Sequence, residues 1–146
     1  MSGPLDTIPV ITGSVVNSSA FGKGGRLVLG PFKPGPGAAA DDETDQLSLM
    51  MIKGIKDTLL KDSAHFTILA DDTKDPDFYL EGHIEDYASK GHFARLFVNG
   101  EIELRETGER ILIFQASTKI DLKTQNSETA AYQIGVAMAH FIRSKS

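Results

Sequence analysis

The sequence predicts an α+β domain in which a mixed sheet of about five strands carries two helices on one face. Three observations predict this class. Residues 78–122 read as consecutive strands of alternating polarity, apolar residues recur at helical spacing in two segments, and a Pro/Gly-rich stretch follows the first strand. Alternation over that length is typical of an antiparallel sheet with one buried face and one hydrated face. The predicted order of elements is β-α-β-β-β-β-α.

The chain length fits a single domain, because it contains 146 residues. We expect residues 1–25 to form a flexible N-terminal arm or linker, since glycine, proline and serine are frequent there. Within this arm, Val10 to Val16 is a candidate edge strand. Residues 26–146 are expected to form the folded domain.

The first half of the domain reads as strand, loop and helix. Arg26–Phe32 is a short apolar strand, and Lys33–Ala40 reads as a loop because proline fixes φ and glycine permits positive φ. The acidic residues 41–45 suit a helix N-terminus, so a helix is predicted from Glu43 to Lys61. Its apolar stripe recurs every four residues: Leu47, Met51, Ile55 and Leu59.

The second half of the domain begins with a strand from His65 to Leu69. The antiparallel strands after it are joined by turns at Ser89–His92 and Glu106–Glu109, the second of which has the glycine that a hairpin turn requires. A final helix is expected to begin near Asn126 or Ser127, since both residue types cap helices well. Six residues of the two helices should be buried against the same sheet face: Leu47, Met51, Ile55, Ile134, Met138 and Phe141.

Composition excludes several classes of function. The net charge of −5 argues against non-specific nucleic-acid binding, and we do not find aromatic residues interleaved with basic ones as in single-strand binding platforms. The sequence has no cysteine, so disulfides, thiolate catalysis and cysteine-ligated zinc are excluded. No apolar run reaches the length of a membrane span, and the first residues lack the features of a signal peptide.

Metal or acid/base chemistry has two candidate locations. His83 shares a strand face with Glu81 and Glu85, so an imidazole and a carboxylate could form a metal site or an acid/base pair. The same residues are also ordinary for a hydrated strand face, and the other histidines are scattered. The second location is an aspartate turn whose spacing does not fit an EF-hand, so we expect a hydrated turn and no tight metal site. Its residues are Asp71, Asp72, Asp75 and Asp77.

No cofactor is predicted. The segment Gly30–Gly37 lies between a strand and a helix, where phosphate-binding loops occur, but it matches neither nucleotide-binding pattern. Its prolines also remove the N–H donors that a phosphate needs. No Gly-x-Ser-x-Gly motif indicates a hydrolase.

Partner binding is the role we assign to the Pro/Gly loop and the hydrated face of the sheet. An exposed loop that a strand and a helix hold at its ends is a common binding element, and aromatic area on a sheet face is another. The alternative is that the N-terminal arm covers this face. The candidate residues are Lys33, Pro34, Pro36, Tyr79, Phe97 and Phe114.

Four short motifs resemble one family of bacterial envelope proteins. They are Leu27–Phe32, which ends in Pro-Phe, the Phe-x-Ile-Leu pattern at Phe66–Leu69, Asp77–His83 and Thr107–Leu112. The family includes outer-membrane lipoproteins, the curli secretion-channel subunit, the lipoprotein activators of penicillin-binding proteins and the N-terminal domain of the Tol translocation protein. The similarity covers about residues 26–143. It implies an anchored, non-enzymatic module that faces the periplasm and binds other proteins or itself.

The leading hypothesis is therefore a binding or assembly module of a bacterial envelope lipoprotein. Such a protein would be anchored to the outer membrane if an export signal and a lipid-bearing cysteine precede residue 1. One alternative is a small metal-binding or acid/base enzyme that uses His83 and its neighbouring carboxylates. Another is a cytoplasmic ligand-binding domain.

Overall fold

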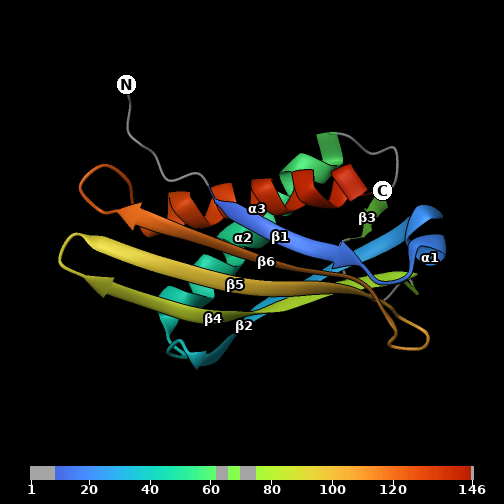
Figure 1. The fold of residues 1–146 in the computed structure, drawn as a ribbon, viewed down its shortest axis with the longest axis horizontal. Coiled ribbons are helices and arrows are strands. Elements are labelled where there is room, and N and C mark those ends of the chain that lie inside the picture. The colour runs from blue at the N-terminus through green and yellow to red at the C-terminus, as the bar shows by residue number, and fades with distance from the viewer. Residues whose placement is uncertain (1–8, 62–65, 70–74, 146) are drawn as a thin grey trace.

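The computed structural model describes residues 9–61, 66–69 and 75–145 and confirms the α+β class (Figure 1). Its elements are β1 (Val10–Val15), α1 (Ser18–Gly22), β2 (Gly25–Gly37), α2 (Asp42–Lys61), β3 (Phe66–Leu69), β4 (Phe78–Lys90), β5 (Phe93–Leu104), β6 (Arg110–Asp121) and α3 (Ser127–Lys145). The order is β-α-β-α-β-β-β-β-α, so the structure adds a strand and a short helix at the beginning.

The strands form one six-stranded mixed sheet in the order β1-β6-β5-β4-β2-β3. β4, β5 and β6 are an antiparallel meander, and β1 lies antiparallel to β6. β2 lies parallel to both β4 and β3, with α2 as the connection between β2 and β3. Figure 1 shows the strands in front of α2, with α3 along the side of the molecule where β1 lies.

Alternating burial in the meander follows the alternating sequence. In β4 and β5 the apolar positions point to the helices and have no exposed surface, as for Leu80, Ile84, Leu96 and Val98. The residues between them face the opposite side and are half-buried or exposed. The predicted sheet with one buried face is therefore confirmed, and burial of these side chains is the main stabilising contribution.

Both long helices pack on the same face of the sheet, as predicted. Five of the six side chains expected at this interface are fully buried, and the sixth, Phe141, is half-buried against the core. Each helix also has the expected charge at its ends, with acidic residues in the first turn and basic residues in the last. The helical spacing of apolar residues therefore identified the buried stripes correctly.

Close contact between α2 and α3 depends on two glycines. A Cβ atom at Gly54 would lie 2.2 Å from the carbonyl oxygen of Tyr132, and one at Gly135 would lie 2.1 Å from that of Met51. Since real Cβ atoms do not approach a carbonyl so closely, only glycine allows the two backbones to approach at this crossing.

Tyr87 on β4 connects the beginnings of both helices. Its hydroxyl donates to Glu43 Oε2 at 2.8 Å and lies 2.7 Å from Ser127 Oγ. Glu43 is in the first turn of α2 and Ser127 begins α3, so the two helices start at the same end of the sheet. At this end the Asn126 side chain caps α3 by accepting from the Thr129 N–H at 2.7 Å, as its residue type predicted.

The expected flexible arm is wrong for residues 10–25, which belong to the fold, whereas the candidate edge strand Val10 to Val16 is confirmed as β1. β1 pairs with β6 along its whole length, and α1 buries Phe21, whose ring lies 5.7 Å from that of Phe66. Asn17 caps α1 by accepting from the Ala20 N–H at 3.1 Å. Glycine and serine in this segment indicated a linker, whereas here they serve strand pairing and a helix end.

The expected loop from Lys33 to Ala40 is also wrong in its first half, because β2 continues to Gly37. Prolines fit this strand because β3 pairs with β2 only as far as Val28, which leaves β4 as the remaining described neighbour. The pairing with β4 is irregular around Pro31 and before Gly37. Of the aspartate turn, only Asp75 and Asp77 lie in the described residues, as does all of the second strand except His65.

The Gly135→Ala substitution should destabilise the fold, although alanine normally favours a helix over glycine by about 1 kcal/mol. We expect a loss of about 1–3 kcal/mol in unfolding free energy, because the new methyl group meets the α2 backbone. Urea unfolding measures it. The control is Gly22→Ala in α1, where nothing lies within 4 Å of the new Cβ. A gain in stability for Gly135→Ala would contradict the close crossing.

Candidate functional site

The sheet face opposite α2 and α3, called here the outer face, carries most of the predicted functional residues. No helix among the described residues covers it (Figure 1). Antiparallel sheets often leave one face hydrated, so this arrangement does not by itself indicate a site. The side chains that β4, β5 and β6 present there include Tyr79, Glu81, His83, Glu85, Arg95, Phe97, Asn99, Glu101, Glu103, Arg110, Ile113, Gln115, Ser117 and Lys119.

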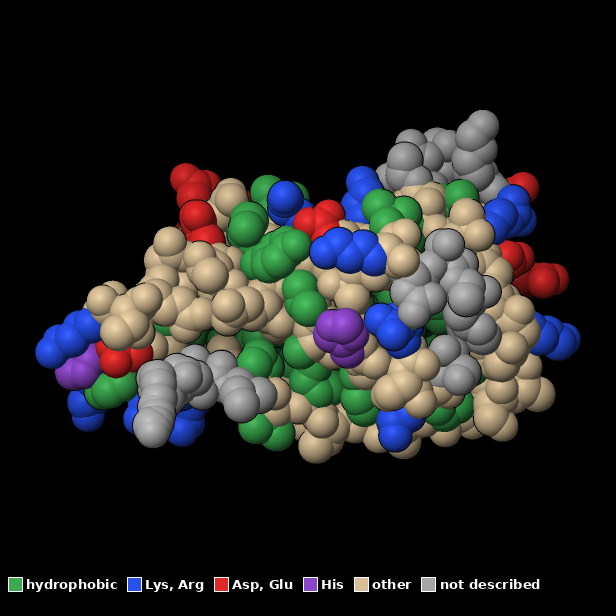
Figure 2. All heavy atoms as spheres, turned by 90° about the horizontal axis from the view of Figure 1, so that it is seen from above, with side chains coloured by type: hydrophobic (Ala, Val, Ile, Leu, Met, Phe, Trp, Pro, Cys, Tyr) green, Lys and Arg blue, Asp and Glu red, His purple; other side chains and the backbone are tan. Residues whose placement is uncertain are grey.

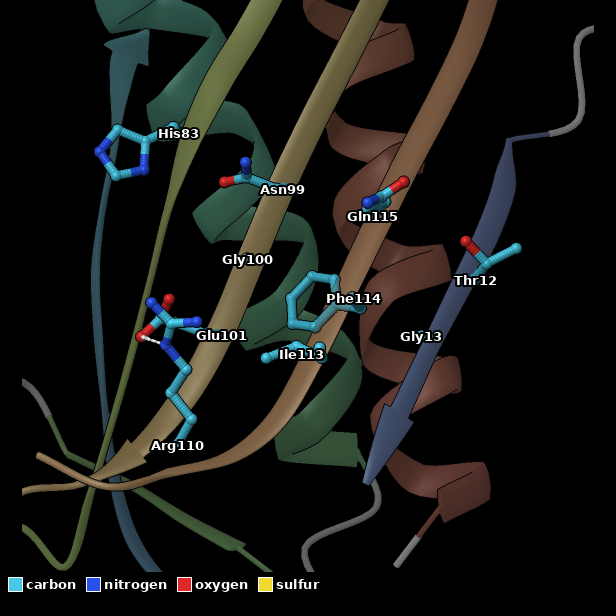
Figure 3. Close-up of a pocket in the computed structure, with 10 residues that line it drawn as sticks. All are labelled: Thr12, Gly13, His83, Asn99, Gly100, Glu101, Arg110, Ile113, Phe114 and Gln115. Carbon is cyan, nitrogen blue, oxygen red and sulfur yellow. Dashed lines mark ion pairs between the residues drawn. The ribbon is translucent and has the colours of Figure 1, made fainter. Parts of the chain in front are cut away.

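An open depression of about 440 Å³ lies on this face between β4 and β1 (Figure 3). Its lining combines an imidazole from His83, an amide from Asn99, a carboxylate from Glu101 and a guanidinium from Arg110. Figure 3 shows that they come from three neighbouring strands, with Arg110 directed toward Glu101. A shallow and polar depression of this kind suits a polar surface better than an enclosed apolar ligand.

Three carboxylates gather beside the depression. Glu81, Glu101 and Glu103 each have an oxygen within 4.8 Å of the others, and all three are half-buried. Burial raises the pKa of Glu103, and the neighbouring charges of Glu81 and Glu101 raise it further. Arg110 partly offsets this repulsion through an ion pair with Glu101 at 3.4 Å. Among the described residues, these three glutamates form the group whose carboxylate oxygens could hold a hard cation.

The predicted pairing of His83 with carboxylates differs from this cluster. His83 is exposed at the depression, and the cluster of Glu81, Glu101 and Glu103 does not include it. One of its expected partners, Glu85, accepts a hydrogen bond from Asn99 Nδ2 at 2.9 Å. In the aspartate turn, Asp77 accepts from the Arg26 N–H at 2.9 Å and forms an ion pair with that side chain, so it has a structural role.

Two of the three aromatic residues predicted for partner binding lie on the outer face. Phe97 is half-buried there, and Tyr79 lies under the Arg105 guanidinium, 5.4 Å from its ring centroid. Phe114, in contrast, is on the helix side and is only 2% exposed. Its ring covers Gly100 and lies 6.2 Å from that of Phe141. Phe114 is therefore a core residue and is not accessible to a partner.

The three residues predicted for a binding loop lie in β2. Lys33 is opposite His83 of β4 and is exposed, Pro34 is opposite Ile84 and half-buried, and Pro36 is exposed. Their strand pairs with β4 on one side, so they form part of a sheet margin and not a free loop. Their role in binding stays a prediction.

Cations and aromatic rings cluster at the end of the β4–β5 hairpin, which the sequence analysis missed. Lys119 Nζ lies 4.3 Å from the Phe93 ring centroid, and the His92 and Phe93 rings are 4.1 Å apart. Lys90 and Arg95 line the same shallow pocket as Phe93. The statement that basic and aromatic residues do not interleave was wrong here, and the run from Lys90 to Phe97 contained the signal.

These features define a class: a six-stranded mixed sheet with two long helices on one face and an open, charged outer face. Among solved structures, the fold is similar to the PelC dodecamer from Paraburkholderia phytofirmans, with a TM-score of 0.64 and 10% identity over 94% of this chain and 97% of that one. It is also similar to the lipoprotein GNA1162 from Neisseria meningitidis, with a TM-score of 0.53 and 9% identity over 82% and 96% of the two chains.

The expected lipoprotein-like fold is thus shared with a lipoprotein of known structure, and at such low identity the likeness to both proteins concerns the fold alone. No protein-family model and no curated protein sequence matches the chain. Within the described part of the chain, neither α2 nor α3 nor any other helix combines the length and apolar character that a membrane crossing needs.

Glu103→Gln should stabilise the protein near neutral pH. Because the pKa of Glu103 is raised above its ordinary value of 4.5 in the folded state, the folded protein binds this proton more tightly than the unfolded chain. The bound proton therefore adds to folding stability in acid. This contribution is lost as the pH rises from the pKa of Glu103 in the unfolded chain through its higher pKa in the folded protein. Urea unfolding should show a gain at neutral pH that disappears in acid. The control is Glu106→Gln in the exposed β5–β6 turn, and an equal gain at both pH values would contradict the assignment.

Truncation of two phenylalanines separates core from surface. We expect Phe114→Ala to cost about 3–5 kcal/mol in unfolding free energy, because the ring fills the space over Gly100. Phe97→Ala, on the outer face, should cost well under half of that. Chemical denaturation of both variants checks the difference, and similar losses would show that the outer face is packed more tightly than described.

Proposed function

We propose that this chain is a non-enzymatic assembly module of the bacterial envelope that associates with copies of itself. The observation that carries the proposal is the match to the PelC dodecamer, which extends over 94% of this chain and 97% of that one. A fold shared over the whole domain, and not over one motif, supports a shared way of building an oligomer. Identity of 10% leaves the interface residues themselves free to differ.

The envelope location rests on two supports. One is the fold similarity to GNA1162, which is described as a lipoprotein. The other is the set of short motifs that resemble the curli secretion-channel subunit, the activators of penicillin-binding proteins and the Tol protein domain. In this proposal the domain faces the periplasm and is held at the outer membrane by an anchor that precedes residue 1.

The charged outer face supports binding in preference to chemistry. The depression is open, the nearby carboxylates repel one another, and Arg110 already pairs with one of them. The cationic end of the β4–β5 hairpin lies on the same sheet. A face with separated positive and negative regions suits recognition of another charged surface.

Self-association is tested by sedimentation velocity and native mass spectrometry of the purified domain over a wide concentration range. We expect a defined oligomer whose population rises with concentration, because association follows mass action. The control is the same measurement at high salt, which weakens contacts between exposed charges but leaves apolar and backbone contacts largely intact. A monomer at every concentration would contradict the proposal.

The location is tested separately in the organism that encodes the protein. The full gene product, detected by antibody after fractionation of envelope and cytoplasm, should be found with the envelope. Recovery in the cytoplasm alone would contradict this part of the proposal and favour the cytoplasmic alternative.

A further inference from the structure

The two edges of the sheet differ in how they are protected against pairing with another chain. β1 is one edge, and among the described strands it pairs with β6 alone. Its sequence, Val-Ile-Thr-Gly-Ser-Val, contains neither a charge nor a proline. Natural proteins usually place such residues, or a bulge, on an edge strand because free backbone groups attract other strands. The pairing of β1 with β6 is also regular.

The opposite edge is well protected. β3 has four residues and pairs with β2 only as far as Val28. Beyond that point Pro31, Pro34 and Pro36 have no N–H to donate. The N–H of Phe32, which lies between them, donates to Ser48 Oγ of α2 at 2.9 Å. An incoming strand would therefore find few donors along β2, so the two edges are poor partners for each other in sheet pairing.

The backbone of β1 presents a regular set of free groups. The Val16 N–H donates to the Ile111 carbonyl of β6 at 2.8 Å. In an antiparallel strand successive residues direct their N–H and C=O groups to alternate sides. By this alternation Ile11, Gly13 and Val15 direct theirs away from β6, toward the open side of the sheet. These residues could pair with one further antiparallel strand.

We propose that β1 pairs antiparallel with β1 of a second copy about a two-fold axis at Gly13, which joins the two six-stranded sheets edge to edge. The inference rests on the self-association proposed above and assigns it a surface. This register puts Ile11 opposite Val15 of the other copy, Thr12 opposite Ser14, and Val10 opposite Val16. In this register the residues whose N–H and C=O groups point away from β6 lie opposite one another, which is the arrangement that antiparallel hydrogen bonding requires.

The side chains support this register on both faces. Val10 and Val16 are 63% and 55% exposed, and the pairing covers both. Thr12 and Ser14 are exposed hydroxyl residues that can hydrogen-bond across strands. Ile11 and Val15 are half-buried on the helix side, where they extend the core to this edge. Shifting the register by two residues would leave Val15 opposite Pro9, outside the strand.

The α3 side of this edge is also suited to a second copy. Figure 2, which looks onto the side of the molecule where β1 and α3 lie, shows several hydrophobic patches among charged and polar side chains. β1 and α3 begin at the same end of the sheet, so the two-fold axis would set the two α3 helices antiparallel. The acidic first turn of each, with Glu128, then lies at the same end as the basic last turn of the other, with Arg143 and Lys145.

Cysteine cross-linking of this domain tests the register, because its 146 residues contain no cysteine. Thr12→Cys and Ser14→Cys are prepared separately, mixed under reducing conditions and then oxidised. Across the proposed ladder the two positions are directly opposite, at about 4.5–5.5 Å, which suits a disulfide, whereas two Thr12 positions are diagonal at about 7–8 Å. We expect at least about tenfold more cross-linked dimer in the mixture than in either variant alone.

The matched control mixes Ser14→Cys with Gln115→Cys. Gln115 is exposed on β6 directly opposite Thr12 of its own chain, and so lies one strand further from the proposed axis. Equal cross-linking in this mixture would overturn the inference, because it would show random collision. If sedimentation shows an oligomer but the cross-linking is not specific, the β1 interface is wrong and the proposed self-association stands. If the domain is a monomer, both are wrong.

A double variant with added charge tests the same edge of the sheet without cross-linking. Thr12→Lys together with Ser14→Lys would place like charges opposite one another in the ladder, and both side chains are exposed, so the fold should be retained. We expect association at least about tenfold weaker. Gln115→Lys is the control for added charge on the same face. Unchanged association of the double variant, with its thermal unfolding also unchanged, would overturn the inference.

Discussion

The contact between α2 and α3 at Gly54 and Gly135 is the constraint on which the rest of the structure depends. Because each glycine faces a carbonyl or amide of the other helix, the two backbones approach more closely than side chains normally allow. A narrow helix pair can then place both apolar stripes on one sheet face. Tyr87 fixes the ends of the same pair, since its hydroxyl contacts both first turns. The helix layer is thereby confined to one side, which leaves the outer face open.

A second arrangement of glycines shapes the sheet under those helices. Gly82 and Gly100 lie directly opposite each other in β4 and β5. Glycine usually weakens a strand, but here the rings of Phe32 and Phe114 occupy the space where their side chains would be. The two rings are part of the core because the glycines admit them. This explains why the middle of the sheet is well packed although it lacks large side chains on two adjacent strands.

The features that depend on local periodicity could be predicted from the sequence. The features that depend on which strand lies alongside could not. Helical spacing located the buried stripes, and turn glycines located the hairpins, such as Gly108 with φ of 74°. Phe114 was misplaced because it ends an apolar run, Ile111 to Phe114, in which alternation cannot assign a face. The short helix α1 and the prolines of β2 were misread, because glycine and proline indicate linkers and loops until the neighbouring strand is known. The contact between Lys119 and the Phe93 ring joins residues of two strands, so the spacing of residues along the sequence does not predict it.

The prolines of β2 have a consequence for polymerisation. A sheet with two open edges can add subunits without limit along the hydrogen-bonding direction, and such growth is the origin of fibrils. A sheet with one blocked edge can pair with another sheet at its free edge only. Once that edge is occupied, no further strand can be added along the hydrogen-bonding direction. Pro31, Pro34 and Pro36 therefore confine growth along the sheet to a finite end point. Copies that paired through their free edges would therefore form a closed pair along the hydrogen-bonding direction.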